Sequence, residues 1–245
     1  MHFLNRTKKD GDRYAIFGGI LINSKAKIEV PDKKSNMEEK KIQNGVYLVI
    51  DPSMKQQQLF ERLAEVLKEK ICAVQIWDHF PSKESKQKII PVVCAMCRAA
   101  DVPVLINNEW EMLKQFPLDG VHFDVLPANL EEIRRKVGRE FITGITVNNN
   151  LDVVATAEQN KVTYISFCSV FPSSTSNSCE RVTFDTIHKA RTITSLPIFL
   201  AGGMRLENIS KLDELDYNGV AVISGIMQAG DPAQATKQYN QLLKK

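Results

Sequence analysis

The sequence has 245 residues, of which 43% are hydrophobic and 25% are charged, as is typical of one large globular domain. This composition excludes a disordered chain, a collagen-like chain and a small disulfide-rich protein. The formal net charge is only +3, so we expect neither a nucleic-acid-binding nor a membrane-binding surface. No apolar run reaches the ~18 residues that a membrane helix needs. The five cysteines, an odd and modest number, favour reduced thiols and a cytoplasmic location.

Residues 1–44 differ in composition from the rest of the chain. They contain 10 Lys or Arg and 6 Asp or Glu, a net charge of +4, whereas the other 201 residues have a net charge of −1. The stretch 31–43 is rich in Lys, Glu and Asn, as solvated linkers are. We therefore predict a polar, poorly ordered N-terminal extension at 1–44 and a single domain at 45–245. Met37 lies just before the first predicted strand, and a start of translation at this residue is an alternative hypothesis to a start at Met1.

From residue 45 onward, short apolar runs alternate with helical patterns. The predicted strands are 46–50, 72–77, 102–106, 120–123, 141–147, 162–168, 197–201 and 219–224. The predicted helices that follow them are 59–67, 90–100, 111–116, 130–137, 151–159, 183–193, 206–215 and 232–243. Strands that are apolar throughout are covered on both faces and are therefore parallel. Eight such units predict a (β/α)8 TIM barrel, with a doubly wound open sheet as the competing architecture.

Cys94 and Cys97 form a C-x-x-C motif inside a predicted helix. The sequence has no second pair of this kind to complete a zinc site, and redox motifs lie at a strand-to-helix turn instead. We therefore expect these cysteines to be structural.

Two glycine-containing turns follow the seventh and eighth predicted strands. They are Gly202-Gly203 and Ile223-Ser224-Gly225. In TIM barrels these loops commonly bind phosphate at the C-terminal ends of the strands, because glycine lets backbone N–H groups approach an anion. We predict that Gly202, Gly203, Ile223 and Ser224 bind a substrate phosphate. The alternative is that the glycines only relieve crowding between strand and helix.

The connection after the sixth predicted strand, residues 170–178, is long for a barrel loop and rich in hydroxyl groups. We expect it to cover a polar ligand. The alternative is a flexible, solvated loop.

From Val46 to the C-terminus the sequence resembles the thiamine phosphate synthase (thiamine-phosphate pyrophosphorylase) family. The resemblance is carried, in family order and spacing, by YLVID, VQI, VPVLINN, LDGVHF, GITVNN, SVFPSSTS, PIFLAGGMRLENI and GVAVISGI. It implies a transferase that joins hydroxymethylpyrimidine diphosphate to a thiazole phosphate and releases pyrophosphate, with Mg²⁺ as cofactor. It also implies small-molecule pyrimidine and thiazole partners and a possible homo-oligomer.

The part of the family site that holds the thiazole phosphate looks intact. By resemblance, the backbone N–H groups of Gly203, Ile223 and Ser224 would bind this phosphate. Ser173 and Thr175 stand where the family has a pair of threonines.

The part that holds the diphosphate departs from the family pattern. The strand-two signature Q-x-R-x-K reads here as Gln75, Trp77 and His79, so both cations are replaced. The family's Asn-Asp pair is Asn107-Asn108, its second metal-binding aspartate falls on Pro127, its loop lysine on Ser176, and its strand-five serine on Thr146. The resemblance thus implies catalytic roles for Gln75, Asn107 and Thr146. Asn108 occupies one metal position, and Asp124 is a candidate relocated metal ligand.

Three functions stay open at this point. The first is a divergent thiamine phosphate synthase. The second is an isomerase similar to the thiazole tautomerases. The histidine that those isomerases have after strand five is Asn148 or Asn149 here, so His79 or His122 would be the general base. The third is a protein that binds a phosphorylated heterocycle without catalysis.

Overall fold

The computed structural model describes residues 8–9, 12–17, 20–23, 42–172 and 180–243. The first three ranges form the strands β1 (Lys8–Lys9), β2 (Asp12–Phe17) and β3 (Ile20–Asn23), which pair in a small antiparallel sheet. The division into an extension at 1–44 and a domain at 45–245 stays a prediction.

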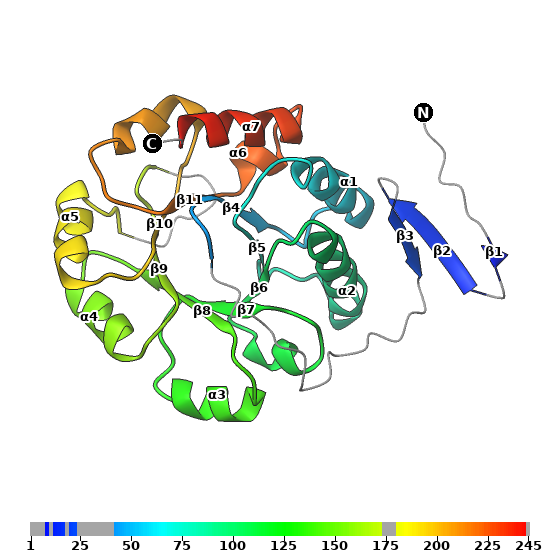
Figure 1. The fold of residues 1–245 in the computed structure, drawn as a ribbon, viewed down its shortest axis with the longest axis horizontal. Helices are drawn as coiled ribbons and strands as arrows, with labels where there is room; N and C mark the ends of the chain where they lie inside the picture. The colour runs from blue at the N-terminus through cyan, green and yellow to red at the C-terminus, as the bar shows by residue number, and fades with distance from the viewer. Residues whose placement is uncertain (1–7, 10–11, 18–19, 24–41, 173–179, 244–245) are drawn as a thin grey trace.

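The strands that follow are parallel and close into a barrel, which confirms the predicted fold class. They are β4 (Gly45–Ile50), β5 (Ala73–Ile76), β6 (Val104–Asn107), β7 (Gly120–Phe123), β8 (Ile142–Val147), β9 (Tyr164–Phe167), β10 (Ile198–Ala201) and β11 (Gly219–Val222). Each pairs with the next along the chain, and β11 pairs with β4 to close the ring. Figure 1 shows the strands at the centre and the helices around them.

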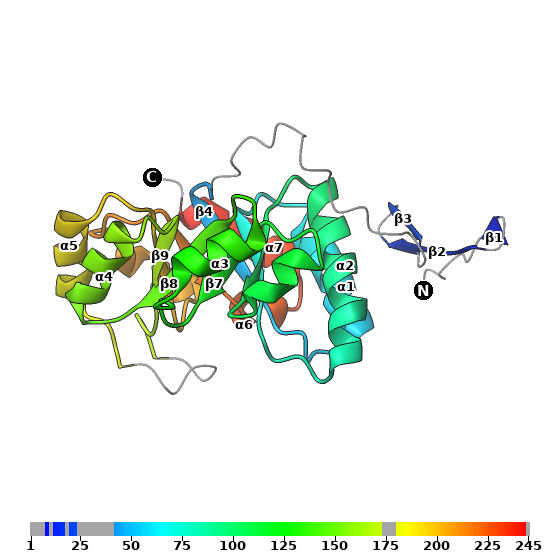
Figure 2. The ribbon, with the colours of Figure 1, turned by 90° about the horizontal axis from the view of Figure 1, so that it is seen from below.

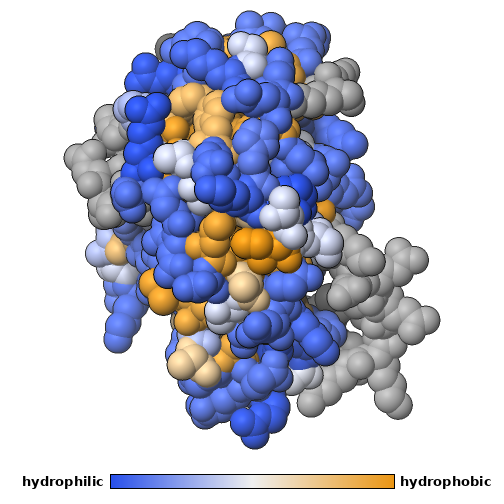
Figure 3. All heavy atoms as spheres, turned by 90° about the vertical axis from the view of Figure 1, so that its left-hand side faces the viewer, coloured by the Kyte–Doolittle hydropathy of each residue, from blue (hydrophilic) through white to orange (hydrophobic). Residues whose placement is uncertain are grey.

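The helices cover the outside of this barrel. They are α1 (Gln56–Val66), α2 (Lys83–Ala99), η1 (Trp110–Lys114), α3 (Leu130–Val137), α4 (Leu151–Gln159), α5 (Phe184–Ile193), η2 (Leu206–Leu212), α6 (Ser224–Met227) and α7 (Pro232–Leu242). In the side view of Figure 2 they stand alongside the strands. On the face in Figure 3 their side chains are mostly hydrophilic, with smaller hydrophobic areas between them.

The helices α1 and α2 begin earlier than predicted, at Gln56 instead of 59 and at Lys83 instead of 90. The structure differs from the predicted elements in two further respects. The segments at 110–114 and 206–212 are 3-10 helices, which are common as short connecting pieces. The last strand ends at Val222 instead of residue 224, and the chain turns at Ile223 into α6. This four-residue helix is shorter than one period of the hydrophobic pattern, so the sequence did not indicate it.

The barrel has two hydrophobic cores because its strands are buried on both faces. Along β4, Val46, Leu48 and Ile50 pack against the helices, whereas Tyr47 and Val49 belong to the smaller cluster inside the barrel. This alternation explains why the strands read as continuous apolar runs. The outer core also contains the two cysteines of the C-x-x-C motif, which are buried in α2, as expected of structural thiols. Burial raises the pKa of the Cys94 thiol to about 12.

None of the helices in the described part of the chain is long and apolar enough to cross a membrane.

Closure of the barrel depends on a close approach at Gly219, where a Cβ atom would lie 2.1 Å from the carbonyl oxygen of Gly45 and 2.8 Å from the ring of Phe199. We expect Gly219→Ala to lower the free energy of unfolding by about 2–4 kcal/mol, because β11 must move away from β4. Denaturant unfolding monitored by circular dichroism measures this loss. Gly230→Ala is the control, since no atom lies within 4 Å of its Cβ position. Equal stability of the two variants would contradict the prediction.

Candidate active site

A pocket of about 340 Å³ opens inside the barrel mouth, and every barrel strand contributes to its lining. This volume suits a small-molecule ligand. The pocket brings together these residues that the sequence predicted: Gln75, Asn107, Asp124, Thr146, Gly202, Gly203, Ile223 and Ser224. Asn108 lies beside it, bonded to Asp124. Ser173 and Thr175 lie outside the described residues.

The turn after β10 brings the chain close to the turn after β9. Gly202 and Gly203 have φ angles of +92° and +63°, which favour glycine. A Cβ atom at Gly202 would lie 2.5 Å from Cα of Ser169, and one at Gly203 would lie 2.3 Å from the carbonyl oxygen of Pro172. The glycines therefore do relieve crowding, as the alternative interpretation held. Relief of crowding and phosphate binding are compatible, because both residues also line the pocket.

Ser169, on the other side of this contact, carries two marks of a functional position. Its φ is +54°, which is uncommon for a residue with a side chain. The residue is only 7% exposed, lines the pocket, and its Oγ has no hydrogen-bond partner among the residues that the structure describes. Buried hydroxyls are nearly always bonded, so this one indicates a place for a polar ligand atom. The sequence analysis assigned Ser169 no role, because backbone strain leaves no pattern in a sequence.

The turn after β11 completes this side of the pocket. Ser224 is the first residue of α6, and the first N–H groups of a helix have no acceptor within it. These N–H groups, the turn at Gly202–Gly203 and the hydroxyl of Ser169 lie on one side of the pocket, and groups of this kind bind anions in proteins. We call this side the phosphate end.

The opposite side of the mouth holds two carboxylates joined by amides. Asn108 Nδ2 lies 3.0 Å from Asp78 Oδ2 and 2.8 Å from Asp124 Oδ2, so one amide bridges both side chains. The backbone N–H of Asp124 donates in turn to Asn108 Oδ1, at 3.0 Å. Asn107 Nδ2 also faces both carboxylates, at 3.3–3.4 Å. We call this group, Asp78, Asn107, Asn108 and Asp124, the acidic end.

The acidic end does not fit a Mg²⁺ ion as it is arranged. Mg²⁺ requires oxygen ligands in a near-octahedral set. Here the amide N–H groups of Asn107 and Asn108 occupy the space between the carboxylates of Asp78 and Asp124 and donate to their oxygens. Among the described residues, no group of three His, Cys, Asp or Glu side chains could hold a metal. The structure thus gives no support to a metal site at the predicted positions Asn108 and Asp124.

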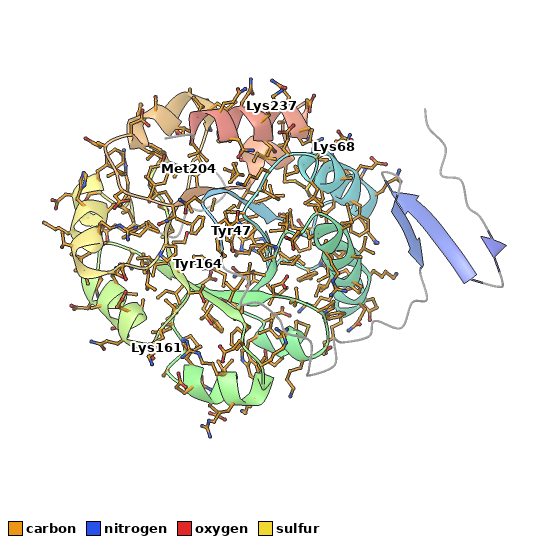
Figure 4. All side chains as sticks on the ribbon, viewed as in Figure 1. Tyr47, Lys68, Lys161, Tyr164, Met204 and Lys237 are labelled. Carbon is orange, nitrogen blue, oxygen red and sulfur yellow. The ribbon has the colours of Figure 1, made fainter. Side chains whose placement is uncertain are left out.

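A buried set of hydrogen bonds runs across the floor of the pocket. Tyr47 Oη lies 2.9 Å from Gln75 Oε1 and 2.8 Å from Tyr164 Oη. His122 Nδ1 lies 2.8 Å from Tyr164 Oη, and His122 Nε2 lies 2.9 Å from Thr146 Oγ1. Figure 4 shows Tyr47 and Tyr164 inside the ring of strands, whereas Lys68, Lys161 and Lys237 lie on its outside. Sequence reasoning missed both tyrosines, because each lies within an apolar run.

His122 is neutral in this environment. Burial lowers its pKa to about 4, and the charge of Asp124 opposes this shift only in part. Both of its ring nitrogens are engaged in hydrogen bonds in the barrel mouth.

Trp77 and His79 occupy the positions where the family pattern has cations. Their rings stack with centroids 3.8 Å apart and an angle of 25° between the planes. Trp77 lines the pocket and presents an aromatic surface to a ligand. Among the described lining residues, Asp124 and Arg205 carry a charge, whereas His122 is neutral.

The acidic end predicts an outcome for Asn108→Asp. A third carboxylate beside Asp78 and Asp124 replaces an N–H donor by a negative charge, so we expect the metal-free variant to lose about 2 kcal/mol of stability. Mg²⁺ should restore it, because three carboxylates then form an oxygen ligand set. Thermal unfolding with EDTA and with Mg²⁺ measures both effects.

Asn150→Asp is the control for Asn108→Asp, because it adds the same charge at the exposed N-cap of α4. An Asn108→Asp variant whose melting temperature is the same with EDTA and with Mg²⁺ would contradict the proposed geometry.

The lowered pKa of His122 predicts how stability depends on pH. An imidazole is protonated below about pH 6.5 in the unfolded chain, but only below about pH 4 in the folded protein. The unfolded state therefore binds more protons between these values, and stability falls as the pH falls. From pH 7 to pH 4.5 we expect the wild type to lose about 2 kcal/mol more than His122→Gln. Urea unfolding across this range tests the difference, and parallel pH profiles would refute it.

Comparison with known proteins agrees with this fold. A sequence profile described as thiamine monophosphate synthase matches residues 46–226. The thiamine-phosphate synthase of Xylella fastidiosa is 27% identical over 195 residues, which cover 80% of this chain and 82% of that protein. The Methylobacillus flagellatus enzyme of the same name is 30% identical over 147 residues, or 60% and 70% of the two chains. The solved thiamine phosphate pyrophosphorylase of Pyrococcus furiosus superposes with a TM-score of 0.72 at 20% identity, over 84% of this chain and 97% of that one. The chain belongs to the thiamine monophosphate synthase family.

Proposed function

We propose that this protein is a transferase of thiamine phosphate synthesis, which joins a pyrimidine activated as its diphosphate to a thiazole phosphate. Family membership supports the reaction class. The observation that carries the proposal is the phosphate end, where the backbone of Ser169 lies against the turn at Gly202–Gly203 and its buried hydroxyl has no partner among the described residues.

The thiazole phosphate would bind at this end. Backbone N–H groups at Gly203 and at Ile223–Ser224 would donate to its oxygens, and Ser169 Oγ would add one more donor. Its ring would then extend toward the aromatic and amide groups at the centre of the mouth.

The pyrimidine would bind over Gln75, Asn107 and Trp77. Trp77 offers a face for stacking, and Thr146 and the two amides offer hydrogen-bonding groups to a heterocycle. In this arrangement the two rings meet above the floor of the barrel.

The reaction moves charge in a way that suits the acidic end. The bond between the pyrimidine methylene carbon and the diphosphate oxygen breaks, and its electron pair leaves with pyrophosphate. The thiazole nitrogen donates its lone pair to that carbon, so the product carries a positive ring. The carboxylates of Asp78 and Asp124 stabilise positive charge that develops on the methylene carbon and then on the ring. The chain itself need transfer no proton.

The same carboxylates favour a second candidate, a protein that binds a phosphorylated heterocycle without diphosphate transfer. The diphosphate carries about three negative charges, and loss of one charged partner in such a site costs about 2–5 kcal/mol. The described lining offers Arg205, and the sequence 173–179 contains no Lys or Arg.

A thiazole isomerase is less well supported than either of these. Both ring nitrogens of His122 are engaged, and its low pKa makes it a weak base.

Three assays of the purified protein distinguish the transferase, the isomerase and the binding protein. Pyrophosphate release from pyrimidine diphosphate and thiazole phosphate, measured with and without Mg²⁺, supports the transferase. Conversion of the thiazole phosphate alone to an isomer supports the isomerase. Saturable binding of thiazole phosphate with neither reaction supports the binding protein and overturns the transferase.

The phosphate end itself is tested by Gly203→Ala. A Cβ atom there would collide with carbonyl groups of Phe171 and Pro172 and separate the two turns, so we expect thiazole phosphate to bind at least about tenfold more weakly. Gly138→Ala is a matched control, because Gly138 also has a positive φ, +70°, but its Cβ position is 4.0 Å from the nearest atom. Both variants should lose a similar ~1 kcal/mol to backbone strain. Isothermal titration of both variants measures the affinities, and unchanged affinity in Gly203→Ala would place the phosphate elsewhere.

A further inference from the structure

The hydrogen bonds of the acidic end and of the pocket floor form one continuous chain. It runs from the carboxylates through Asn107, Gln75, Tyr47, Tyr164 and His122 to Thr146. Its two ends, Asp124 and Thr146, both line the pocket. The direction of donation along this chain can be worked out link by link from the carboxylates.

At the first link, the carboxylates fix the orientation of two amides. A carboxylate only accepts hydrogen bonds, so Asn107 turns its Nδ2 toward Asp78 and Asp124. Its Oδ1 therefore faces Gln75, which donates from Nε2. Gln75 Oε1 is left to accept, and Tyr47 supplies its proton. The negative charges of Asp78 and Asp124 thus fix the orientation of the Asn107 and Gln75 amides in the pocket floor.

At the next link, the tyrosines fix the tautomer of His122. The proton of Tyr47 is already donated to Gln75, so the contact of 2.8 Å between Tyr47 and Tyr164 uses the proton of Tyr164. Tyr164 Oη can then only accept from His122, which carries its proton on Nδ1. The other tautomer would leave two hydroxyl oxygens 2.8 Å apart with no proton between them.

At the last link, Thr146 gives up its only proton. His122 is neutral and holds its hydrogen on Nδ1, so Nε2 is a bare lone pair. The contact of 2.9 Å to Thr146 is therefore a donation from Oγ1. Thr146 Oγ1 can then present only lone pairs to the pocket.

We infer that Asp78 and Asp124, acting through this chain, make Thr146 an obligate acceptor and so select a ligand that presents an N–H or O–H group to it. Tyr47, Tyr164 and His122 are positioning residues, since each acts through its neighbour. For the reaction proposed above, on which this last step rests, the group that fits is the amino substituent of an aminopyrimidine. A ring nitrogen lone pair or a methyl group at the same place would meet an oxygen that cannot donate to it.

The tautomer of His122 is the direct test, and it requires no ligand. In the full chain labelled with ¹⁵N-histidine at neutral pH, we expect His122 to carry its proton on Nδ1 and to leave Nε2 bare, with the signal assigned by its loss in His122→Gln. In Tyr164→Phe the acceptor for Nδ1–H is gone, so the proton should move to Nε2 and donate to Thr146.

Phe199→Leu is the control for packing. Phe199 contacts the rings of Tyr47 and Tyr164, with centroids 5.5 Å and 5.4 Å away, but it takes no part in the hydrogen bonds. Its variant should therefore keep the Nδ1–H form. A wild-type His122 with its proton on Nε2 would overturn the inference, whatever the protein binds.

The consequence for the ligand is tested by two probes. They are hydroxymethylpyrimidine phosphate and its analogue with a methyl group in place of the amino group. We expect the wild type to bind the amino form at least tenfold more tightly. In Thr146→Val this preference should fall to about twofold, whereas Thr146→Ser should keep it.

Equal affinity of the wild type for the two probes overturns the selection. If the wild type binds neither probe, both the selection by Thr146 and the binding of a pyrimidine in this pocket are rejected. The tautomer of His122 still tests the direction of hydrogen-bond donation along the chain in that case. None of these experiments measures turnover. A protein that lacks transferase activity can therefore still confirm or contradict this inference.

Discussion

Helices cover the outside of the barrel, so the polar side chains that point into it can form hydrogen bonds only with one another or with a ligand. Gln75, His122, Tyr47 and Tyr164 are between 1% and 6% exposed, and each is bonded to another of these residues or to a neighbour in the same chain. A buried polar group without a partner costs about 1–3 kcal/mol, so a change in one member reaches the next. The side chains of the pocket are therefore positioned as a connected set, and residues 117 apart in the sequence share one hydrogen bond.

The shape of the backbone makes room for this set. A Cβ atom at Gly144, in β8, would lie 2.0 Å from Cζ of Tyr164, so a glycine is required where the tyrosine ring crosses the neighbouring strand. The large side chain that β9 directs into the barrel therefore requires a residue without a side chain on the neighbouring strand β8, because the interior of a small barrel is closely packed. The place of the Tyr164 hydroxyl, and with it the orientation of His122, follows from a residue that has no side chain.

Much of the fold could be predicted from the sequence, because strands covered on both faces are continuous apolar runs and their order fixes the barrel. The grouping of the turns after the seventh and eighth strands in one pocket could be predicted for the same reason, whereas phosphate binding by them stays a prediction. Tyr47 and Tyr164 could not be found, because an apolar run buried on both faces does not tell inward from outward positions. Asp78 and Asp124 are joined by the Asn108 amide, which depends on the turn at Asn108 with its φ of +55°. The spacing of residues in the sequence does not indicate this turn.

The pocket has opposite electrical character at its two ends, and this has consequences for any ligand that spans it. Backbone N–H groups near Gly203 are of the kind that favour an anion, whereas Asp124, which is exposed, repels an anion and attracts positive charge. A ligand with phosphate at one end and a positive or proton-bearing ring at the other can satisfy both ends in only one orientation. A second phosphate beside the ring would meet the carboxylates. The same charges that would stabilise a cationic ring would therefore weaken the binding of a diphosphate and favour its departure once its bond to the methylene carbon is broken. In the proposed reaction the acidic end would act on the carbon that loses the diphosphate, and the backbone of the phosphate end would hold the thiazole phosphate that replaces it.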